Sequence, residues 1–139
     1  MNSVLPVGVI GLGRMGTIYA GHLARHSKSQ IVCISDLIEG RAQATAVELG
    51  VESWSTDYRD VLENKAIKAV FVTSSTSTHR EVVMAAAQAG MAIFCEKPIA
   101  LTLEDTDQMI AAIEGNGVMF QAGFMRRFDS GYVAAKGQI

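Results

Sequence analysis

The sequence has little net charge and no long basic run. Its 139 residues carry 12 basic and 14 acidic side chains, so the formal net charge is −2. The longest run of Lys or Arg is the pair Arg126 and Arg127. Because nucleic-acid binding requires a basic surface patch, nucleic acid is not an expected partner.

Long apolar runs are also missing. The longest, residues 82–95, is interrupted by Gln88 and Gly90 and is shorter than the ~20 residues that cross a bilayer. The first apolar run has no Lys or Arg before it and ends in glycines instead of a cleavage site, which disfavours a secretory signal. We therefore expect a cytoplasmic protein with no membrane partner. At this length the chain forms one domain, so an enzyme that needs two domains would be incomplete here.

Short apolar strands alternate with amphipathic helices along the chain. Runs of β-forming residues predict strands at residues 7–12, 31–35, 52–54, 69–73, 92–95 and 118–124. Helical spacing of apolar residues predicts helices at residues 15–26, 41–49, 78–89 and 102–115. Strands joined by helices require right-handed crossovers, and hence a parallel sheet with helices on both faces. The predicted fold class is α/β, a doubly wound parallel sheet in the strand order 3-2-1-4-5-6.

The cysteines and histidines predict neither a disulfide nor a metal site. In this strand order Cys33 and Cys95 lie three strand spacings apart, about 14 Å. A disulfide requires Cα atoms within about 7 Å, so we expect two buried free thiols. His22 and His26 are four residues apart, but no third ligand is near them in the sequence.

The pattern changes after Phe124. Residues 125–129 break the last strand, and residues 130–138 predict an amphipathic helix that continues to the C-terminus. We expect residues 1–124 to form one domain, and residues 125–139 to be a linker that leaves it. A solvated strand end is the alternative for the charged pair Arg126 and Arg127.

A glycine motif, G-x-G-x-x-G, separates the first strand from the first helix. The first glycine permits a tight turn, the second lets the backbone approach a pyrophosphate, and the third lets the helix lie close to the strand. The pyrophosphate would rest on the free N–H groups at the start of the helix. A glycine-rich turn without a ligand is the alternative. The predicted cofactor contacts in this turn are Gly11, Leu12, Gly13, Arg14, Met15 and Gly16.

Asp36 ends the second strand, about 20 residues after the motif, where Rossmann dinucleotide folds place an acid on the adenosine ribose. A carboxylate there accepts hydrogen bonds from both ribose hydroxyls and repels a 2′-phosphate, which favours NAD over NADP. Arg41 weakens this preference only slightly, because the immediate neighbours Leu37 and Ile38 are apolar. A simple turn aspartate is the alternative.

Polar residues follow the fourth strand at the crevice where the strand order reverses. Ser74, Ser75 and His79 are predicted to line the cofactor cleft, and Thr78 is predicted to cap the next helix.

Glu96, Lys97 and Pro98 end the fifth strand at the ligand edge of such a sheet. Residue statistics favour an exposed Lys97 paired with Glu96. The functional alternative is a catalytic lysine, either as a hydrogen-bond donor to the reacting oxygen or as a base whose pKa falls from about 10.4. The proline predicts a cis Lys97–Pro98 bond. Glu96, Lys97 and Gln121 complete the predicted cofactor contacts.

Together these motifs resemble those of the Gfo/Idh/MocA family of oxidoreductases. The segments that carry the resemblance span the chain: the glycine motif, Asp36, the loop ending in His79, Glu96-Lys97-Pro98 and residues 123–129. Within the family, residues 123–132 most resemble those of myo-inositol 2-dehydrogenases. Ser74 and Ser75 depart from the family's usual proline and asparagine.

The resemblance implies an NAD-dependent oxidation of a ring hydroxyl of a polyol or sugar. It implies that Lys97 is the catalytic residue at the reacting alcohol and that Met125 and Arg126 lie near the substrate. It also implies that residues 1–124 are the dinucleotide-binding domain, and that residues 125–139 are a linker and the start of a C-terminal substrate domain that the chain lacks. An aspartate, and a histidine four residues later, would complete the proton relay from that second, mostly β-sheet domain. We expect the full-length protein to be a homo-oligomer.

Two other functions are alternatives. A free-standing dinucleotide-binding module that senses redox state would finish its last strand and stop, whereas residues 125–139 continue beyond it. A methyltransferase-like fold has similar glycines and a similar acid, but no use for Lys97 before Pro98. The sequence favours the truncated dehydrogenase domain, which we expect to be inactive alone.

Overall fold

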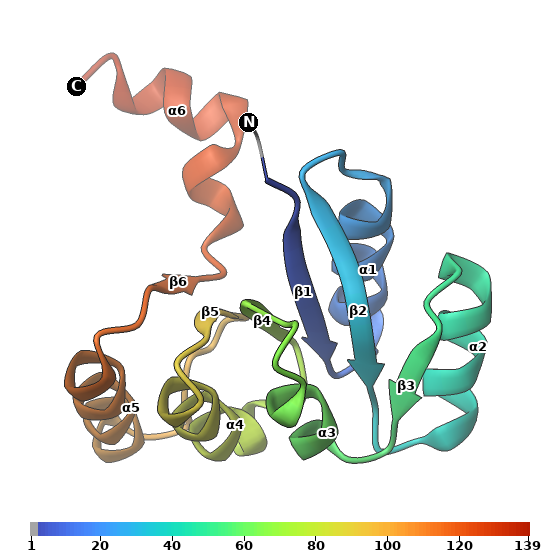
Figure 1. Cartoon of the computed structure of the whole chain (residues 1–139). Helices are drawn as coiled ribbons and strands as arrows, with labels where there is room; N and C mark the ends of the chain where they lie inside the picture. The colour runs from blue at the N-terminus through green and yellow to red at the C-terminus, as the bar shows by residue number, and fades with distance from the viewer. Residues whose placement is uncertain (1–2) are drawn as a thin grey trace.

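The computed structural model describes residues 3–139 and contains one parallel six-stranded sheet (Figure 1). The strand order is β3-β2-β1-β4-β5-β6, and every neighbouring pair is parallel. The predicted fold class and strand order are therefore confirmed. The strands are β1 (Leu5–Ile10), β2 (Ser29–Ser35), β3 (Ser53–Ser55), β4 (Ala69–Val72), β5 (Ala92–Cys95) and β6 (Phe120–Ala122).

Helices connect consecutive strands, and Figure 1 shows α1 and α2 beside β1–β3, with α4 and α5 beside β4 and β5. Within residues 3–139, every helix is too short or too polar to span a bilayer. The helices are α1 (Arg14–Arg25), α2 (Glu39–Leu49), α3 (Tyr58–Glu63), α4 (Thr76–Gln88), α5 (Leu103–Asn116), the 3₁₀ turn η1 (Met125–Phe128) and α6 (Ser130–Lys136).

The sheet is buried on both faces at its centre. Successive residues of a strand point to opposite faces, so Val9 and Ile10 of β1 enter two different hydrophobic clusters. The cluster of Val9 includes Ala46 of α2, and the cluster of Ile10 includes Val83 of α4. Val9 and Ile10 are 0% and 3% exposed, as the apolar runs of an internal parallel strand require.

One helix was missed in the sequence, and one prediction about a helix cap is wrong. The missed helix is α3, which Asp57 caps by accepting a hydrogen bond from the Arg59 N–H at 2.9 Å. Thr78 does not cap α4, because the helix begins earlier, with Ser75 at the N-cap. The hydroxyl of Thr78 instead donates to the carbonyl of Ser75 at 2.8 Å.

The remaining predictions for the helices, strands and cysteines agree with the structure. The bounds of the predicted strands and helices differ from the observed ones by two residues at most. Thr102 caps α5 through the Asp105 N–H at 3.0 Å. Cys33 and Cys95 are free and buried, and burial raises the pKa of the Cys95 thiol to about 12.

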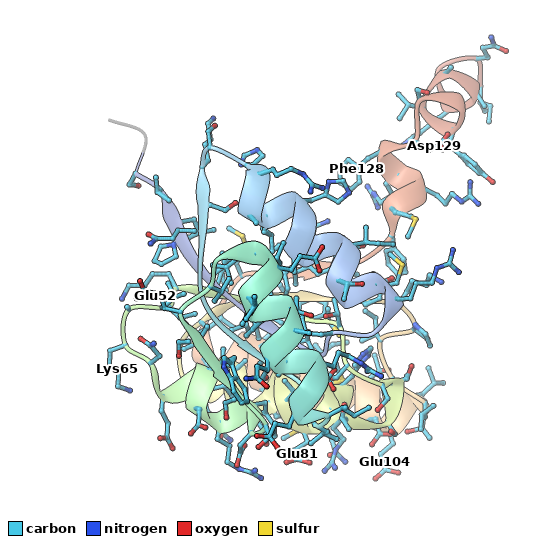
Figure 2. All side chains as sticks on the ribbon, turned by 90° about the vertical axis from the view of Figure 1, so that its right-hand side faces the viewer. Glu52, Lys65, Glu81, Glu104, Phe128 and Asp129 are labelled. Carbon is cyan, nitrogen blue, oxygen red and sulfur yellow. The ribbon has the colours of Figure 1, made fainter. Side chains whose placement is uncertain are left out.

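The C-terminal segment lies apart from the sheet. All residues from Phe124 to Ile139 are exposed. Figure 2 shows η1 and α6, marked by Phe128 and Asp129, extending away from the rest of the chain. Asp129 caps α6 by accepting from the Gly131 N–H at 3.0 Å. The division at residue 124 stays a prediction.

Two adjacent residues of α5 test which face of this helix stabilises the fold. Met109 is 1% exposed in the cluster under α4, and Ile110 is 45% exposed. Met109→Ala should lower the free energy of unfolding by about 2–5 kcal/mol, because it leaves a cavity. Ile110→Ala should cost less than about 1 kcal/mol. Urea unfolding of both variants measures this, and equal losses would show that α5 is packed differently.

Candidate functional site

The carboxyl ends of β1, β2 and β4 surround one large pocket. Its volume is about 890 Å³, within the range of small-molecule and cofactor sites. Parallel strands end at the same edge of the sheet, so residues distant in the sequence meet there. Five residues predicted from the sequence line this pocket: Gly11, Gly13, Asp36, Ser74 and Ser75.

The three glycines of the turn meet different constraints. Gly11 has φ +92°, and a Cβ there would overlap the backbone of Ser74. A Cβ on Gly16 would overlap the carbonyl of Gly11, so α1 can approach β1 only at a glycine. A Cβ on Gly13 would meet no atom within 4 Å among residues 3–139. The fold therefore requires Gly11 and Gly16, while the space beside Gly13 is open.

Thr73, which the sequence predictions omitted, holds this turn in place. Its side-chain hydroxyl donates to the carbonyl of Gly11 at 2.6 Å, and its backbone N–H donates to the carbonyl of Ile10 at 2.8 Å. The first turn of α1 has no acidic residue, and Gly13 supplies no side-chain cap. The free N–H groups at the start of α1 and the positive end of the helix dipole are thus available to bind an anion.

Asp36 ties the end of β2 to the glycine turn. Its Oδ2 accepts from the Leu12 N–H at 2.8 Å, and its Oδ1 accepts from the Ile38 N–H at 2.9 Å. The Leu12 N–H is thus occupied and its side chain is 1% exposed, and its role as a cofactor contact stays a prediction. Arg41, which the sequence suggests matters little, lies 3.3 Å from Asp36 Oδ2.

The far end of the pocket is formed by α3 and α4, and its residues were not predicted. The Tyr58 hydroxyl donates to Glu81 Oε1 at 2.6 Å, and Arg59 Nη2 lies 3.2 Å from the same oxygen. Burial and the Glu81 carboxylate raise the pKa of the Tyr58 hydroxyl to about 12. The local sequence signals for α3 are the acidic residues Asp57 and Asp60 at its start and the helical spacing of Tyr58, Val61 and Leu62.

His79 does not line the pocket, which corrects the sequence prediction. It is 1% exposed, because α4 turns the ring inward under the loop. One ring nitrogen, Nε2, lies 3.0 Å from the carbonyl oxygen of Ser74, and Nδ1 lies 3.0 Å from that of Pro98. His79 therefore joins the loop after β4 to the loop after β5, and it positions the segment that carries Lys97.

Lys97 is exposed at the end of β5, and the Lys97–Pro98 bond is cis, as predicted. The surface ion pair with Glu96 does not form. Glu96 is instead 6% exposed, and its Oε1 accepts from the backbone N–H of Lys97 at 3.1 Å. Its buried Oε2 has no hydrogen-bond partner among residues 3–139. A Cβ on Gly123 would lie 3.1 Å from that oxygen.

Tyr19 of α1 lies beside Glu96. Its ring contacts the ring of Phe94 edge-on, with centroids 5.0 Å apart, and Phe94 stacks on Phe71 at 4.8 Å. Burial, together with the Glu96 carboxylate, raises the pKa of the Tyr19 hydroxyl to about 12. Glu96 is therefore held between α1, β5 and Gly123 at the edge of the sheet.

The other predicted residues lie outside the large pocket. Gln121 is exposed on β6, and Met125 and Arg126 are exposed on η1. The Arg126 guanidinium lies 5.3 Å from the centroid of the Tyr132 ring. Arg14 and Met15 form the start of α1 beside the turn. Roles for these residues stay predictions.

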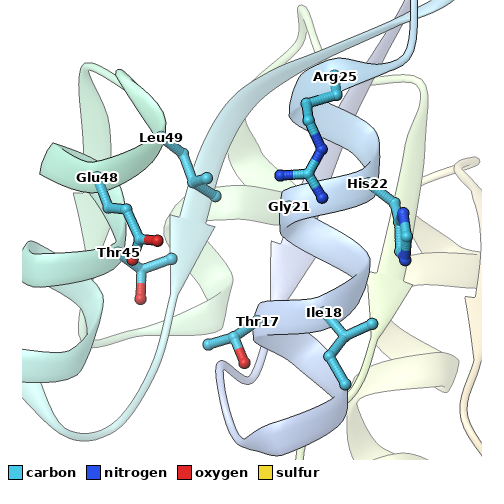
Figure 3. Close-up of a pocket in the computed structure, with 8 residues that line it drawn as sticks. All are labelled: Thr17, Ile18, Gly21, His22, Arg25, Thr45, Glu48 and Leu49. Carbon is cyan, nitrogen blue, oxygen red and sulfur yellow. The ribbon is translucent and has the colours of Figure 1, made fainter.

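A smaller pocket of about 300 Å³ lies between α1 and α2 (Figure 3). Its wall includes Thr17, His22, Arg25 and Glu48, and none of the predicted site residues. No group of three potential metal ligands occurs in the part of the chain that the structure describes. The larger pocket is therefore the candidate site.

A protein-family model matches most of the chain. The GFO_IDH_MocA model, described as an oxidoreductase family with an NAD-binding Rossmann fold, matches residues 5–124. The matched segment contains the glycine turn, Asp36 and Lys97.

Similar proteins are longer than this chain. The scyllo-inositol 2-dehydrogenase (NAD(+)) of Bacillus subtilis is 43% identical over 132 residues, which are 94% of this chain and 39% of that protein. The myo-inositol 2-dehydrogenase of Thermotoga maritima is 42% identical over 130 residues, with the same two shares. Scyllo-inositol dehydrogenase from Lactobacillus casei, with bound NAD(H) and scyllo-inositol, superposes with a TM-score of 0.92 at 33% identity, covering 97% of this chain and 40% of that one.

Alanine substitutions at Gly16 and Gly13 should show which of the two glycines the fold requires. Gly16→Ala should lower the free energy of unfolding by about 1–3 kcal/mol, because the added methyl forces α1 away from Gly11. Gly13→Ala should change it by less than about 1 kcal/mol. Thermal and urea unfolding would measure both, and a strongly destabilised Gly13→Ala would contradict the open space beside Gly13.

Proposed function

The chain belongs to the Gfo/Idh/MocA family of oxidoreductases, and we propose that it is the NAD-binding part of an inositol 2-dehydrogenase. The reaction would remove hydride from a hydroxyl-bearing ring carbon of a polyol. The chain spans about 40% of the length of the relatives it matches, so the activity proposed is that of a longer protein. The free-standing sensor is not favoured, because relatives similar over 94% of this chain are dehydrogenases by name.

The observation that carries this proposal is the open space at Gly13, beside a carboxylate and an uncapped helix start. Nothing in the fold requires glycine at this position, but a pyrophosphate that approaches the backbone does. The start of α1 would receive the phosphate charges, with Arg14 and Met15 in its first turn. Asp36 would accept hydrogen bonds from the adenosine ribose, and the large pocket has room for the adenosine half.

Lys97 is proposed as the group at the reacting alcohol. NAD accepts the hydride when it is bound, while the protein must hold the substrate oxygen and receive its proton. Lys97 comes just after β5, so it lies at the same edge of the sheet as the glycine turn, and its side chain is exposed. As an ammonium ion it donates hydrogen bonds to that oxygen but accepts no proton. A base from outside residues 1–139 would therefore be needed.

The remaining predicted residues complete the proposed site. Gln121 on β6 and Glu96, directly after β5, would contact the nicotinamide half of the cofactor. Met125 and Arg126 on η1 would contact the polyol, since η1 follows β6 at the same edge. We also propose that the longer protein is a homo-oligomer.

Calorimetric titration of the purified chain with each cofactor tests the proposed function. The chain should bind NAD more tightly than NADP, because the carboxylate of Asp36 accepts from ribose hydroxyls and repels a 2′-phosphate. Gly13→Ala should weaken NAD binding at least about tenfold while the chain stays folded, because its methyl occupies the pyrophosphate position. Tighter binding of NADP would refute the role of Asp36, and unchanged NAD binding by Gly13→Ala would refute the role of the turn.

The isolated chain should not oxidise inositol at an ordinary enzymatic rate. Without a base and without groups that orient the polyol, the barrier rises by several kcal/mol, and each 1.36 kcal/mol costs about tenfold in rate. NADH absorbance after mixing the chain with NAD and with myo- or scyllo-inositol measures the rate, with Lys97→Ala as the control. Ordinary turnover that Lys97→Ala abolishes would show that residues 1–139 contain the whole catalytic site.

A further inference from the structure

The carboxylate of Glu96 is buried with one of its two oxygens unused. Glu96 is 6% exposed, and its Oε1 accepts from the backbone N–H of Lys97 at 3.1 Å. Its Oε2 has no hydrogen-bond partner among residues 3–139, and the exposed Lys97 side chain forms no ion pair with it. A buried acceptor without a donor is costly. A donor close to Oε2 would therefore matter for where this carboxylate lies.

Tyr19 is the side chain that the fold brings to this carboxylate. Residues two apart on a strand share a face of the sheet, so Glu96 lies on the same face as Phe94. The ring of Tyr19 contacts the ring of Phe94 edge-on at 5.0 Å and lies 6.0 Å from the ring of Phe71. Phe71 and Phe94 pair across β4 and β5 and stack at 4.8 Å. Two rings therefore fix the direction of the Tyr19 ring, and its hydroxyl stays near Glu96.

The hydroxyl of Tyr19 has the chemistry that Oε2 lacks. Burial, together with the Glu96 carboxylate, raises the pKa of this hydroxyl to about 12, so the phenol keeps its proton at neutral pH. A protonated phenol donates a hydrogen bond, whereas an ionised carboxylate only accepts. Because Oε2 has no partner in the described part of the chain, a short movement of either side chain would close this hydrogen bond.

The other side of the carboxylate is confined by the turn after β6. A Cβ on Gly123 would lie 3.1 Å from Glu96 Oε2 and 3.2 Å from the carboxyl carbon, which leaves little room for a larger residue there. The Gly123 N–H donates to the carbonyl of Cys95 at 2.8 Å, so this turn is tied to the end of β5. Glu96 is thus enclosed by α1 on one side and by Gly123 on the other.

We propose that Tyr19 is a positioning residue whose hydroxyl donates to Glu96 and fixes the direction of its carboxylate. The inference rests on the proposed function, in which Glu96 contacts the nicotinamide half of the cofactor. Tyr19 would then act on that half alone, through Glu96. Loss of the hydroxyl should weaken the binding of the nicotinamide half and leave the binding of the adenosine diphosphate half as it is.

Calorimetric titrations of NAD and of ADP-ribose into wild type, Tyr19→Phe and Tyr132→Phe test the proposal. ADP-ribose lacks the nicotinamide and keeps the rest of NAD. Tyr19→Phe should weaken NAD binding about tenfold, the loss of one hydrogen bond to a carboxylate, and should leave ADP-ribose binding as in wild type. Tyr132→Phe removes the same group from an exposed tyrosine on α6, outside the large pocket, and should match wild type with both probes.

A second pair of variants tests whether Tyr19 acts through Glu96. Two residues that work through one contact have non-additive effects. Adding Tyr19→Phe to Glu96→Ala should therefore leave the dissociation constant of NAD as it is in Glu96→Ala alone. A further tenfold loss in the double variant would show that Tyr19 acts independently of Glu96, and would overturn the proposal.

The remaining outcomes separate this inference from the proposed function. Unchanged NAD binding by Tyr19→Phe, or an equal weakening of NAD and ADP-ribose, would overturn the role of Tyr19. Binding of both probes by wild type would then still support the proposed function. If wild type binds neither probe, the proposed function and this inference fail together. Unchanged circular dichroism and a retained affinity for ADP-ribose would show that Tyr19→Phe is folded.

Discussion

The site depends on the close approach of three backbone segments at Gly11. The turn after β1, the loop after β4 and the first turn of α1 lie so near each other that a single methyl on Gly11 or Gly16 would overlap a neighbouring backbone. Thr73 fastens the contact by donating to the carbonyl of Gly11 at 2.6 Å. This contact positions the start of α1 at the edge of the sheet, and with it the N–H groups that an anion needs.

The two halves of the crevice differ in how far the chain satisfies its own polar groups. On the β2 side, Asp36 has backbone donors on both oxygens, and the carboxylate of Glu81 is held by Tyr58 and Arg59. On the β5 side, Glu96 Oε2 is buried without a partner in residues 3–139, and Lys97 extends into solvent. Unmade hydrogen bonds of buried groups are costly, so the β5 side is where further groups would act in the proposed enzyme.

The sequence predicts the fold and the centre of the site because those features are local. Apolar runs, glycine stops and the spacing from Gly16 to Asp36 predict the strands, the helices and the turn without knowledge of distant contacts. The strand order then follows from the doubly wound fold that this alternation implies. It fails where side chains choose between partners in space. Arg41 meets Asp36 five residues earlier, because one turn of α2 brings the guanidinium back over the end of β2. His79 turns into the core, where Ser74 and Pro98 offer carbonyl oxygens. The short α3 spans less than two turns, so its one apolar set, Tyr58, Val61 and Leu62, is a weak helical pattern.

Buried residues hold the segment after β5 in place, and Glu96 is one of them. Glu96 accepts from the N–H of Lys97, and His79 lies 3.0 Å from the carbonyl oxygen of Pro98, so the backbone on both sides of the cis bond is held from within the fold. The Lys97 side chain is left as the exposed part of an otherwise fixed segment. A side chain that must meet a substrate oxygen binds it at a lower entropy cost when its backbone is fixed, because only the rotamers of that side chain remain to be ordered. Under the proposed function, the buried residues on either side of Lys97 therefore serve the reaction by fixing where its ammonium group can reach.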